Sequence, residues 1–341
     1  MKKMKSRIAS ICLALCLAAL MAGCAGVEKK EEKTGIKIGV AIYRGDDAFI
    51  SSLCASLENE VKDKEEKLGK KVVVNIADAK NSQSSQNDQV DDFISKGYDA
   101  ICVNMVDRTV AAVIVDKAKE AGIPIIFFNR EPVEEDMNRW EKLYYVGESA
   151  KESAVLQGNI LVDAYKKDPA SLDLNGDGKV SYVLLEGETS HQDSLIRTEW
   201  SIQTLKDGGV PLEKITGGIG NWEKSQGSAW MEKWLDEYPD EIELVISNND
   251  DMALGAADAL ERKKITRPIK IVGIDGTPQG IEGLNSGKLF GTVQCDSDEY
   301  ANAVFQIAAA AGLGQNVQEI VSLEGGKYYN CRQTALTADK N

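Results

Sequence analysis

Short apolar runs alternate with amphipathic stretches along most of this chain. The run IKIGVAIY at 36–43 is apolar on both strand faces, and the next stretch places Leu53, Leu57 and Val61 at helical spacing. Strands that are apolar on both faces belong to parallel sheets, because the connecting helices cover each side of the sheet. The sequence therefore predicts an α/β protein built on parallel sheets.

The alternation continues through about ten strand–helix units, which is too many for one sheet, so we expect two doubly wound sheets. We expect strands at 36–43, 71–79, 99–107, 123–129, 144–147, 180–185, 210–216, 241–247, 269–275 and 288–295. Helices are expected at 50–68, 81–97, 110–121, 152–165, in a segment ending at 205, and at 225–235, 252–262, 280–285 and 299–311. Weak strands are expected in the tail.

Polar clusters follow five of these strands. One such cluster would be an ordinary turn, but the carboxyl ends of parallel strands meet at one edge of a sheet, where ligands bind. Five clusters at equivalent places therefore predict a binding site. The clusters are Asp46 with Asp47, Asn129 with Arg130 and Glu131, His191, Asn248 to Asp251, and Asp275.

Sequence motifs narrow the chemistry of this site. The chain has neither a G-x-x-x-x-G-K-[ST] nor a G-x-G-x-x-G motif, so nothing supports nucleotide binding. It also has no G-x-S-x-G elbow, and no serine or cysteine lies in a nucleophile context for its one histidine, His191. A glycosidase needs two carboxylates, which are abundant here, so counting residues leaves that alternative open.

The residue types at the strand ends suit a sugar. Carboxylate, amide, imidazole and guanidinium groups donate or accept in fixed planes, and sugar hydroxyls do both. Phe49 and Trp222 stand in polar sequence (DDAFI and GNWEK), and apolar sugar faces stack on such rings. Taken singly, either aromatic could be a loop anchor, and His191 could be a structural hydrogen-bonding residue.

A loop rich in side-chain oxygens precedes the strand at 180–185. In DLNGDGKVS, the residues Asp173, Asn175, Asp177 and Ser181 stand at alternate positions, and Gly178 occupies the sixth place, where a cation loop turns sharply. The twelfth place, which supplies a bidentate Glu in an EF-hand, is Leu184. The local sequence thus leaves two alternatives open, a metal site completed from elsewhere or a plain polar turn.

The amino terminus has the features of an export signal. Four basic residues precede an apolar run from Ile8 to Met21, which is too short to span a bilayer as a lone helix and ends in small residues before Cys24. This pattern is typical of a bacterial lipoprotein signal at 1–23, with lipid attached to Cys24. A membrane-anchoring helix or an ordinary signal peptide is the alternative. The charged segment 24–35 predicts a flexible tether.

Charge and cysteine spacing exclude other classes. Removing the four basic residues of 1–23 changes the formal charge from −14 to −18, and such an acidic chain argues against nucleic acid as a partner. Beyond Cys24 the cysteines are Cys54, Cys102, Cys295 and Cys331, none in a C-x-x-C pair. We therefore expect buried free thiols and neither a zinc nor a redox site.

Several of these segments resemble the galactose/glucose-binding proteins of bacterial sugar uptake, which have the type I periplasmic-binding fold. The resemblance rests on IGVAIYRGDDAF, NSQSSQNDQVDDFISKGYDAICVNMVD, PIIFFNREP, YYVGESAKESAVLQG, DLNGDGKVSYVLLEGE, IELVISNNDDMALGA and VGIDGTP, and spans nearly all of 36–300. It implies two lobes joined by three hinge strands, one formed by 36–147 plus 297–329 and the other by 148–296 plus 330–341.

The resemblance also implies roles for individual residues. A single hexose would be held in the cleft by hydrogen bonds, and Phe49 and Trp222 would stack on its two faces. A structural calcium ion would be bound by the oxygen-rich loop and completed by Glu243. The implied hydrogen-bonding residues are Asp47, Asn129, His191, Asp193, Arg197, Asn249 and Asp275, and the implied metal ligands are Asp173, Asn175, Asp177, the Lys179 carbonyl, Ser181 and Glu243.

Two positions depart from the family pattern. Cys295 stands where the family has an Asn that contacts the sugar, and Ser181 stands where it has a Gln that binds the metal. A thiol is a weak hydrogen-bonding group, so the exact hexose is left open.

The resemblance implies a monomeric, lipid-anchored binding protein outside the cytoplasm that is not an enzyme and delivers hexose to an ABC permease. The alternative is a sensory sugar-binding protein for a chemoreceptor or histidine kinase. A transcription regulator of the same fold would need an N-terminal DNA-binding helix pair in place of the export signal.

Overall fold

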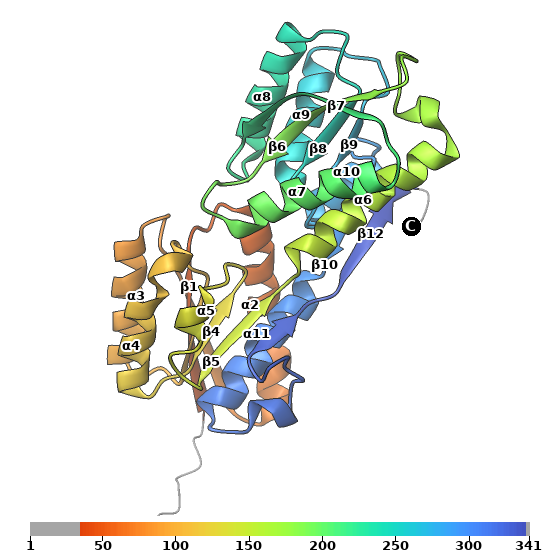
Figure 1. Ribbon diagram of the computed structural model, residues 1–341. Helices are drawn as coiled ribbons and strands as arrows, with labels where there is room; N and C mark the ends of the chain where they lie inside the picture. Colours follow the sequence, from red (N-terminus) through yellow and green to blue (C-terminus); the bar gives the residue numbers. More distant parts are fainter. Residues whose placement is uncertain (1–34, 339–341) are drawn as a thin grey trace, which may run out of the picture. The chain divides into compact units, whose positions relative to one another are not determined.

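The computed structural model describes residues 35–338, which form two lobes, each built on a six-stranded sheet (Figure 1). The sheet of the first lobe has the strand order β11-β5-β4-β3-β1-β2, and all of its neighbouring strands are parallel. Its strands are β1 (Gly35–Ile42), β2 (Lys71–Asp78), β3 (Ala100–Val103), β4 (Ile125–Phe128), β5 (Leu143–Gly147) and β11 (Tyr328–Asn330).

Helices cover both faces of this sheet. On one face α2 (Ala48–Leu68) packs beside α11 (Ser297–Gly312), and on the other α3 (Gln83–Ser95) lies beside α4 (Ala111–Ala121). In β1, Gly39 makes room for an aromatic ring, because a Cβ there would lie 2.5 Å from Cγ of Phe93 on α3. The short helices α5 (Glu134–Met137) and η1 (Arg108–Val110) were not expected from the sequence.

The second lobe repeats this plan. Its sheet has the order β12-β10-β9-β8-β6-β7, in which only β12 runs antiparallel to its neighbour. One face is covered by α6 (Ala150–Lys167) and α7 (Gln192–Asp207), and the other by α8 (Lys224–Glu237), α9 (Asp250–Arg262) and α10 (Pro278–Asn285). The strands are β6 (Val180–Glu186), β7 (Leu212–Ile219), β8 (Leu244–Ser247), β9 (Lys270–Val272), β10 (Gly291–Cys295) and β12 (Gln333–Thr337).

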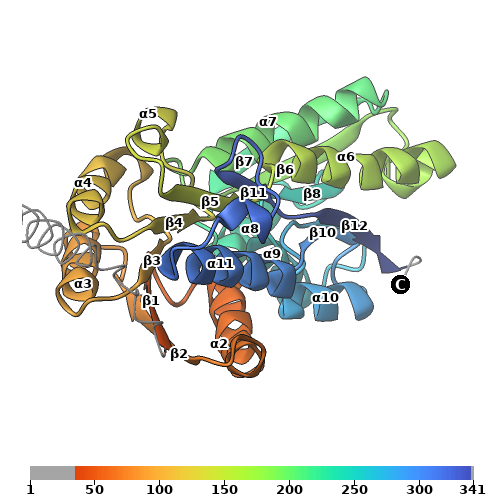
Figure 2. The ribbon, with the colours of Figure 1, turned by 90° about the horizontal axis from the view of Figure 1, so that it is seen from below.

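The chain crosses between the lobes three times, after β5, after β10 and after β11 (Figures 1 and 2). These crossings lie side by side. The backbone N–H of Cys331 donates to the carbonyl of Gly147 at 2.8 Å, and Nε2 of Gln333 lies 3.5 Å from Sγ of Cys295. Three parallel connections of this kind form a hinge that constrains how the lobes move.

The expectation of two doubly wound parallel sheets is confirmed. Some boundaries differ. The helix expected from residue 50 begins at Ala48 because Asp47 caps it, accepting a hydrogen bond from the Ile50 N–H at 2.9 Å. The strand expected at 99–107 ends at Val103, where Asn104 turns its side chain toward Tyr43 and Asn129. Of the expected buried thiols, Cys54 is only half-buried.

Candidate functional site

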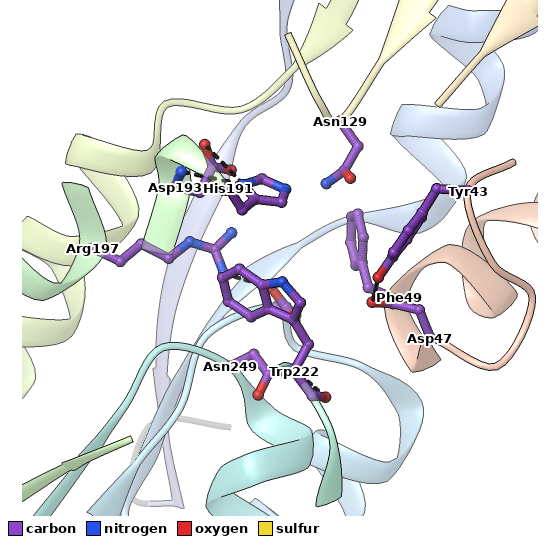
Figure 3. Close-up of a pocket in the computed structure, with 10 residues that line it drawn as sticks. Tyr43, Asp47, Phe49, Asn129, His191, Asp193, Arg197, Trp222 and Asn249 are labelled. Carbon is purple, nitrogen blue, oxygen red and sulfur yellow. Dashed lines mark hydrogen bonds and ion pairs between the residues drawn. The ribbon is translucent and has the colours of Figure 1, made fainter. Parts of the chain in front are cut away.

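A pocket lies between the lobes at the carboxyl ends of both sheets (Figure 3). The cavity enclosed by these side chains is small, about 30 Å³. The lining contains nine of the ten side chains predicted to hold a ligand, and adds Tyr43. The lining residues are Tyr43, Asp47, Phe49, Asn129, His191, Asp193, Arg197, Trp222, Asn249 and Asp275.

Three lining residues are N-caps of helices that start at the cleft. Asp47 caps α2, His191 caps α7, and Asn249 caps α9 with Oδ1 accepting from the Met252 N–H at 3.0 Å. The helix dipoles place partial positive charge at these ends, which favours oxygen-rich ligands. The strand-to-helix turns therefore place both the side chains and the backbone donors at the pocket.

His191 is a neutral donor at this site. Its Nδ1 accepts a hydrogen bond from the backbone N–H of Asp193 at 3.2 Å, so the proton is on Nε2. Burial, together with the nearby guanidinium groups of Arg130 and Arg197, lowers the His191 pKa well below its ordinary value. The imidazole is therefore uncharged at neutral pH and offers Nε2–H to a ligand oxygen.

Three other lining residues have left-handed backbone conformations. The φ angles are 60° at Asn129, 67° at Trp222 and 112° at Asp275. Such conformations cost roughly 1–3 kcal/mol each in residues other than glycine and cluster at functional sites. At Asp275 the strained backbone is held by β10, because its N–H donates to the Val293 carbonyl and its carbonyl accepts from Cys295.

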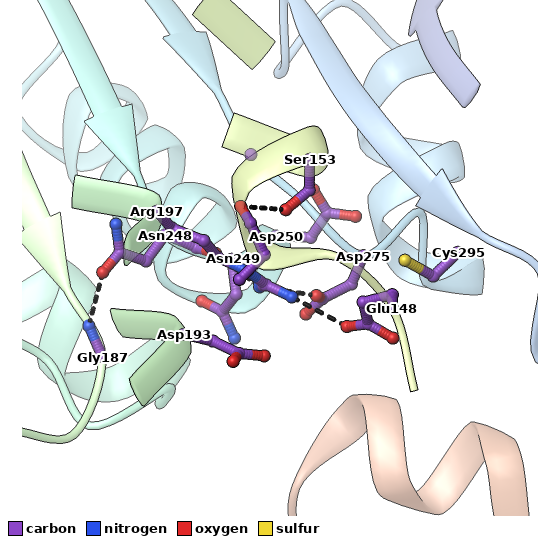
Figure 4. Close-up of polar contacts among 12 residues, drawn as sticks. Glu148, Ser153, Gly187, Asp193, Arg197, Asn248, Asn249, Asp250, Asp275 and Cys295 are labelled. Carbon is purple, nitrogen blue, oxygen red and sulfur yellow. Dashed lines mark hydrogen bonds and ion pairs between the residues drawn. The ribbon is translucent and has the colours of Figure 1, made fainter. Parts of the chain in front are cut away.

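Arg197 is the central cation of the pocket wall. Its Nη1 donates to Oδ1 of Asp275 at 3.0 Å and to the Asn248 carbonyl at 2.9 Å, and its Nη2 donates to Oε1 of Glu148 at 2.9 Å (Figure 4). Burial alone would lower the pKa of Arg197, but Asp275 and the other carboxylates raise it above its ordinary value. The guanidinium therefore stays charged although it is buried.

The carboxyl groups of the wall bind protons more tightly than usual. Burial raises the pKa of Asp193 to about 6 against the opposing effect of Arg197, and it raises the pKa of Asp275 well above its ordinary value. Several acids share one guanidinium, so carboxyl groups outnumber the cation in the wall and offer oxygen atoms to a ligand. Hydroxyl groups suit such a site, because each can donate to one acceptor and accept from another group.

The two predicted aromatic residues come from different lobes. Phe49 lies in the first turn of α2 and meets Tyr300 edge to face at 5.8 Å, while Trp222 follows β7 and meets His191 edge to face at 5.2 Å. A side chain at Gly187 would collide with the Trp222 ring, because a Cβ there would lie 2.2 Å from Cη2. The indole Nε1 is buried without a hydrogen-bond partner, so a ligand oxygen could accept from it.

Cys295 is the predicted contact that does not line the pocket. It ends β10 with its buried thiol beside the hinge and packs in the core of the first lobe. Burial raises the pKa of this thiol well above its ordinary value, so it stays protonated. Tyr43 was missed by the sequence reasoning, although it follows β1 directly and its hydroxyl donates to Asp47 at 2.6 Å.

Ion pairs join the lobes at the mouth of the pocket. Arg130, which follows β4, donates to Oε2 of Glu188 in the second lobe at 2.8 Å, and its guanidinium stacks over the Tyr43 ring at 3.7 Å. Arg44 donates to Glu223 in the second lobe at 3.1 Å. These pairs bridge the two lobes, and none of their four residues lines the pocket itself.

The oxygen-rich loop is ordered by its own hydrogen bonds. The carboxylate of Asp173 accepts from the backbone N–H groups of Gly176 and Gly178, while Asn175 and Asp177 each accept from the N–H two residues on. Glu243, 1% exposed just before β8, accepts from the backbone of Leu174, Asn175 and Ser181 at 2.7–2.9 Å. Among residues 35–338, no group of three or more carboxylate, thiol or imidazole side chains lies close enough together to form a metal-binding cluster.

Two doubly wound lobes, joined by three crossings around a polar cleft with an aromatic side chain from each, define a two-lobed ligand-binding protein. A family model described as a periplasmic binding protein domain matches residues 38–316, and the chain belongs to this family. The D-galactose/methyl-galactoside binding periplasmic protein MglB of Haemophilus influenzae is 38% identical over 284 residues, covering 83% of each chain.

Two further relatives show the breadth of the family. The ribose import binding protein RbsB of Bacillus subtilis is 26% identical over 85% of this chain and 86% of its own. A solved ABC transporter solute-binding protein from Bacillus halodurans with bound myo-inositol has a TM-score of 0.74 and 29% identity, and the match covers 91% of this chain and 96% of that one. Within residues 35–338 no helix is long and apolar enough to cross a membrane.

Proposed function

We propose that this protein binds a hexose, galactose or glucose, outside the cytoplasm and delivers it to an ABC permease. The observation that carries the proposal is the pocket wall itself. Charged and amide groups that fix hydroxyls in defined directions are combined with Phe49 and Trp222, which reach the pocket from opposite lobes. An apolar sugar face can stack on such rings while its hydroxyls reach the polar groups.

No step of covalent chemistry is needed for this function. A binding protein requires only that the ligand favour the closed arrangement of the lobes over an open one. Residues of both lobes line the pocket, so a sugar that contacts both stabilises closure. A permease can then distinguish the loaded protein from the empty one by the arrangement of its lobes.

The proposal includes a structural calcium ion in the second lobe. The ligands would be oxygen atoms of Asp173, Asn175, Asp177, the Lys179 carbonyl, Ser181 and Glu243, and hard cations prefer such oxygen ligands. One observation of the fold supports the fit. The buried Glu243 carboxylate faces the loop, and its partners there are backbone N–H groups rather than a cationic side chain. A bound ion would supply charge neutralisation and a cross-link between the loop and β8.

Membrane attachment through lipid on Cys24 is part of the same proposal. Residues 1–34 lie outside the described part of the chain, so this expectation rests on the sequence pattern. The sugar site and the anchor are independent features and can be tested separately.

Calorimetry on the chain without residues 1–23 tests the binding function. Galactose, glucose, ribose, xylose and myo-inositol are titrated in turn, and we expect galactose or glucose to bind with the lowest dissociation constant. Tighter binding of ribose, xylose or myo-inositol would overturn the hexose assignment but keep a sugar-binding site. Failure of all five to bind would overturn the proposed function.

A further inference from the structure

Glu148 is a buried carboxylate beside the pocket that the sequence reasoning did not single out. It immediately follows β5, in the first crossing between the lobes, and its side chain is only 2% exposed. One oxygen, Oε1, accepts from Nη2 of Arg197 at 2.9 Å, and the protonated thiol of Cys295 is the other hydrogen-bonding neighbour of the carboxylate. A thiol is a weak donor, so burying this carboxylate is costly, and its presence there calls for a physical reason.

The hydrogen bonds of Arg197 suggest that reason. A guanidinium has five N–H groups. In Arg197, three hydrogen bonds fix the plane of the guanidinium. Nη1 donates to Asp275 and to Asn248, and Nη2 donates to Glu148. Nε has no partner, and Arg197 lines the pocket. Because the guanidinium plane is fixed from two sides, the remaining N–H groups of Arg197 point in a constant direction and can donate to a ligand.

The anchors of this plane come from different parts of the fold. Asp275 and Asn248 belong to the second lobe, following β9 and β8, whereas Glu148 belongs to the hinge between the lobes (Figure 4). Figure 4 shows the Arg197 guanidinium pointing toward Asp275 and Glu148, with Cys295 on the far side of Glu148. We propose that Glu148 is a positioning residue of the sugar site, which acts through Arg197 and ties the pocket wall to the first hinge crossing.

This inference rests on the proposed sugar-binding function and adds a residue to it. Because Glu148 acts as an ionised partner of Arg197, sugar affinity should depend on its ionisation. Burial raises the pKa of Glu148 to about 7, with Arg197 opposing and Asp193 adding to the shift. The titratable groups that face it are Arg197 and Asp193 on α7, Cys295 on β10, Asp275 after β9, Tyr300 on α11, Tyr145 on β5 and Cys331 after β11.

The experiment compares galactose affinity of the parent with that of Glu148→Gln from pH 5.5 to pH 8. At pH 8 the variant should bind on the order of tenfold more weakly, because a charge-assisted hydrogen bond becomes a neutral one. Below about pH 6 the two affinities should converge, since the parent Glu148 is then protonated. At pH 7, galactose binding should release a fraction of a proton from the parent and less from the variant, measured by calorimetry in two buffers.

Glu299→Gln is the matched control. Glu299 is also a carboxylate at the hinge, paired with Arg332 and Tyr329, but it does not contact Arg197. Its replacement should leave galactose affinity and its pH dependence unchanged. If Glu148→Gln does not fold, Glu148→Asp serves instead, and it should bind more weakly while keeping the change near pH 7.

Equal affinity of the parent and Glu148→Gln at pH 8 would overturn the inference, as would a deficit that is the same at every pH. Either result would leave the sugar site itself intact, since the parent binds in both cases. Absence of sugar binding by the parent would instead contradict the proposed function.

Discussion

Arg130 of the first lobe donates to Glu188 of the second lobe at 2.8 Å, and the side chains are only 5% and 14% exposed. Neither residue lines the sugar pocket at its centre, since the pair bridges the mouth of the cleft. The pair forms only when the lobes meet, so it contributes to the free energy of closure without contributing a sugar contact.

Glu188→Gln should therefore weaken hexose binding by about 1–2 kcal/mol, between the values for exposed and buried pairs. The loss should appear mainly in the dissociation rate, because closure retains the sugar. Stopped-flow measurement of the intrinsic tryptophan fluorescence can follow that rate. Glu223→Gln, whose pair with Arg44 is more exposed, is the control and should have a smaller effect. An unchanged dissociation rate in Glu188→Gln would show that the ion pair does not stabilise closure.

Trp222 is expected to be an aromatic anchor of the site. Trp222→Ala should weaken hexose binding by about 1–3 kcal/mol, the scale of losing a buried anchor. Gly187→Ala should also weaken binding, because the added Cβ would displace the indole that packs against Gly187. Calorimetry on both variants, with circular dichroism to verify folding, measures the effect. A folded Trp222→Ala protein with the parent's dissociation constant would refute the stacking role.

The proposed calcium site predicts a chelator effect. A metal that binds only the folded state raises stability by RT ln(1 + [L]/Kd), so chelator should lower the melting temperature of the parent. Glu243→Gln should lower stability even in chelator, because Glu243 accepts three backbone hydrogen bonds. The chelator-dependent shift should shrink sharply in this variant. Equal chelator shifts in both proteins would exclude Glu243 as a ligand, and no shift in the parent would mean that the loop is only a turn.

The buried carboxyl groups predict how stability changes with pH. Burial raises the pKa of Asp250 to about 7, from about 3.9 in an unfolded chain. Between these values the folded state holds a proton that the unfolded state has lost, so stability falls as pH rises from about 4 to 7. Glu148 and Asp193 also make the folded state less stable as pH rises, because their pKa values are raised in the same way. His191, with its lowered pKa, does the opposite and makes the folded state more stable as pH rises to about 6.5.

The sugar-free protein should therefore be less stable at pH 7 than at pH 5, as measured by urea unfolding. Asp250→Asn should flatten this dependence; Asp250 does not line the pocket, although its neighbour Asn249 does. A parent that gains stability between pH 5 and pH 7 would contradict the assignment.

Lipid attachment predicts that Cys24→Ala abolishes membrane association. A radiolabelled fatty acid should mark the parent in growing cells and not the variant. Equal labelling of the two proteins would show that Cys24 is not the attachment site, and galactose binding by the soluble fraction checks that the variant still folds.

Sequence patterns predicted the sheets and most of the pocket wall because both depend on one regularity. Apolar runs form parallel strands, and the residues after those strands meet at one edge. Asp47, His191 and Asp275 were found in this way, and their side chains do line the pocket. Their role in holding a sugar stays a prediction.

Other residues could not be placed by that rule. Glu148 stands in YYVGES, where an acidic residue indicates only a polar turn, and its partner Arg197 lies 49 positions further along the chain. Cys295 was expected in the cleft because of its place in a motif. However, side chains alternate along a strand, and at the end of β10 this one faces the hinge. Such facts depend on tertiary packing rather than on local pattern.

The two lobes share the chain in an interleaved way. The lobe that starts at Gly35 takes α11 and β11 from residues 297–330, and the other takes β12 from residues 333–337. A chain made from its amino terminus therefore cannot complete either lobe until almost all of it has been synthesised. Such long-range pairing also slows folding. A fold that is completed so late would leave time for the export that the sequence pattern of residues 1–23 predicts, before the chain becomes too compact to pass.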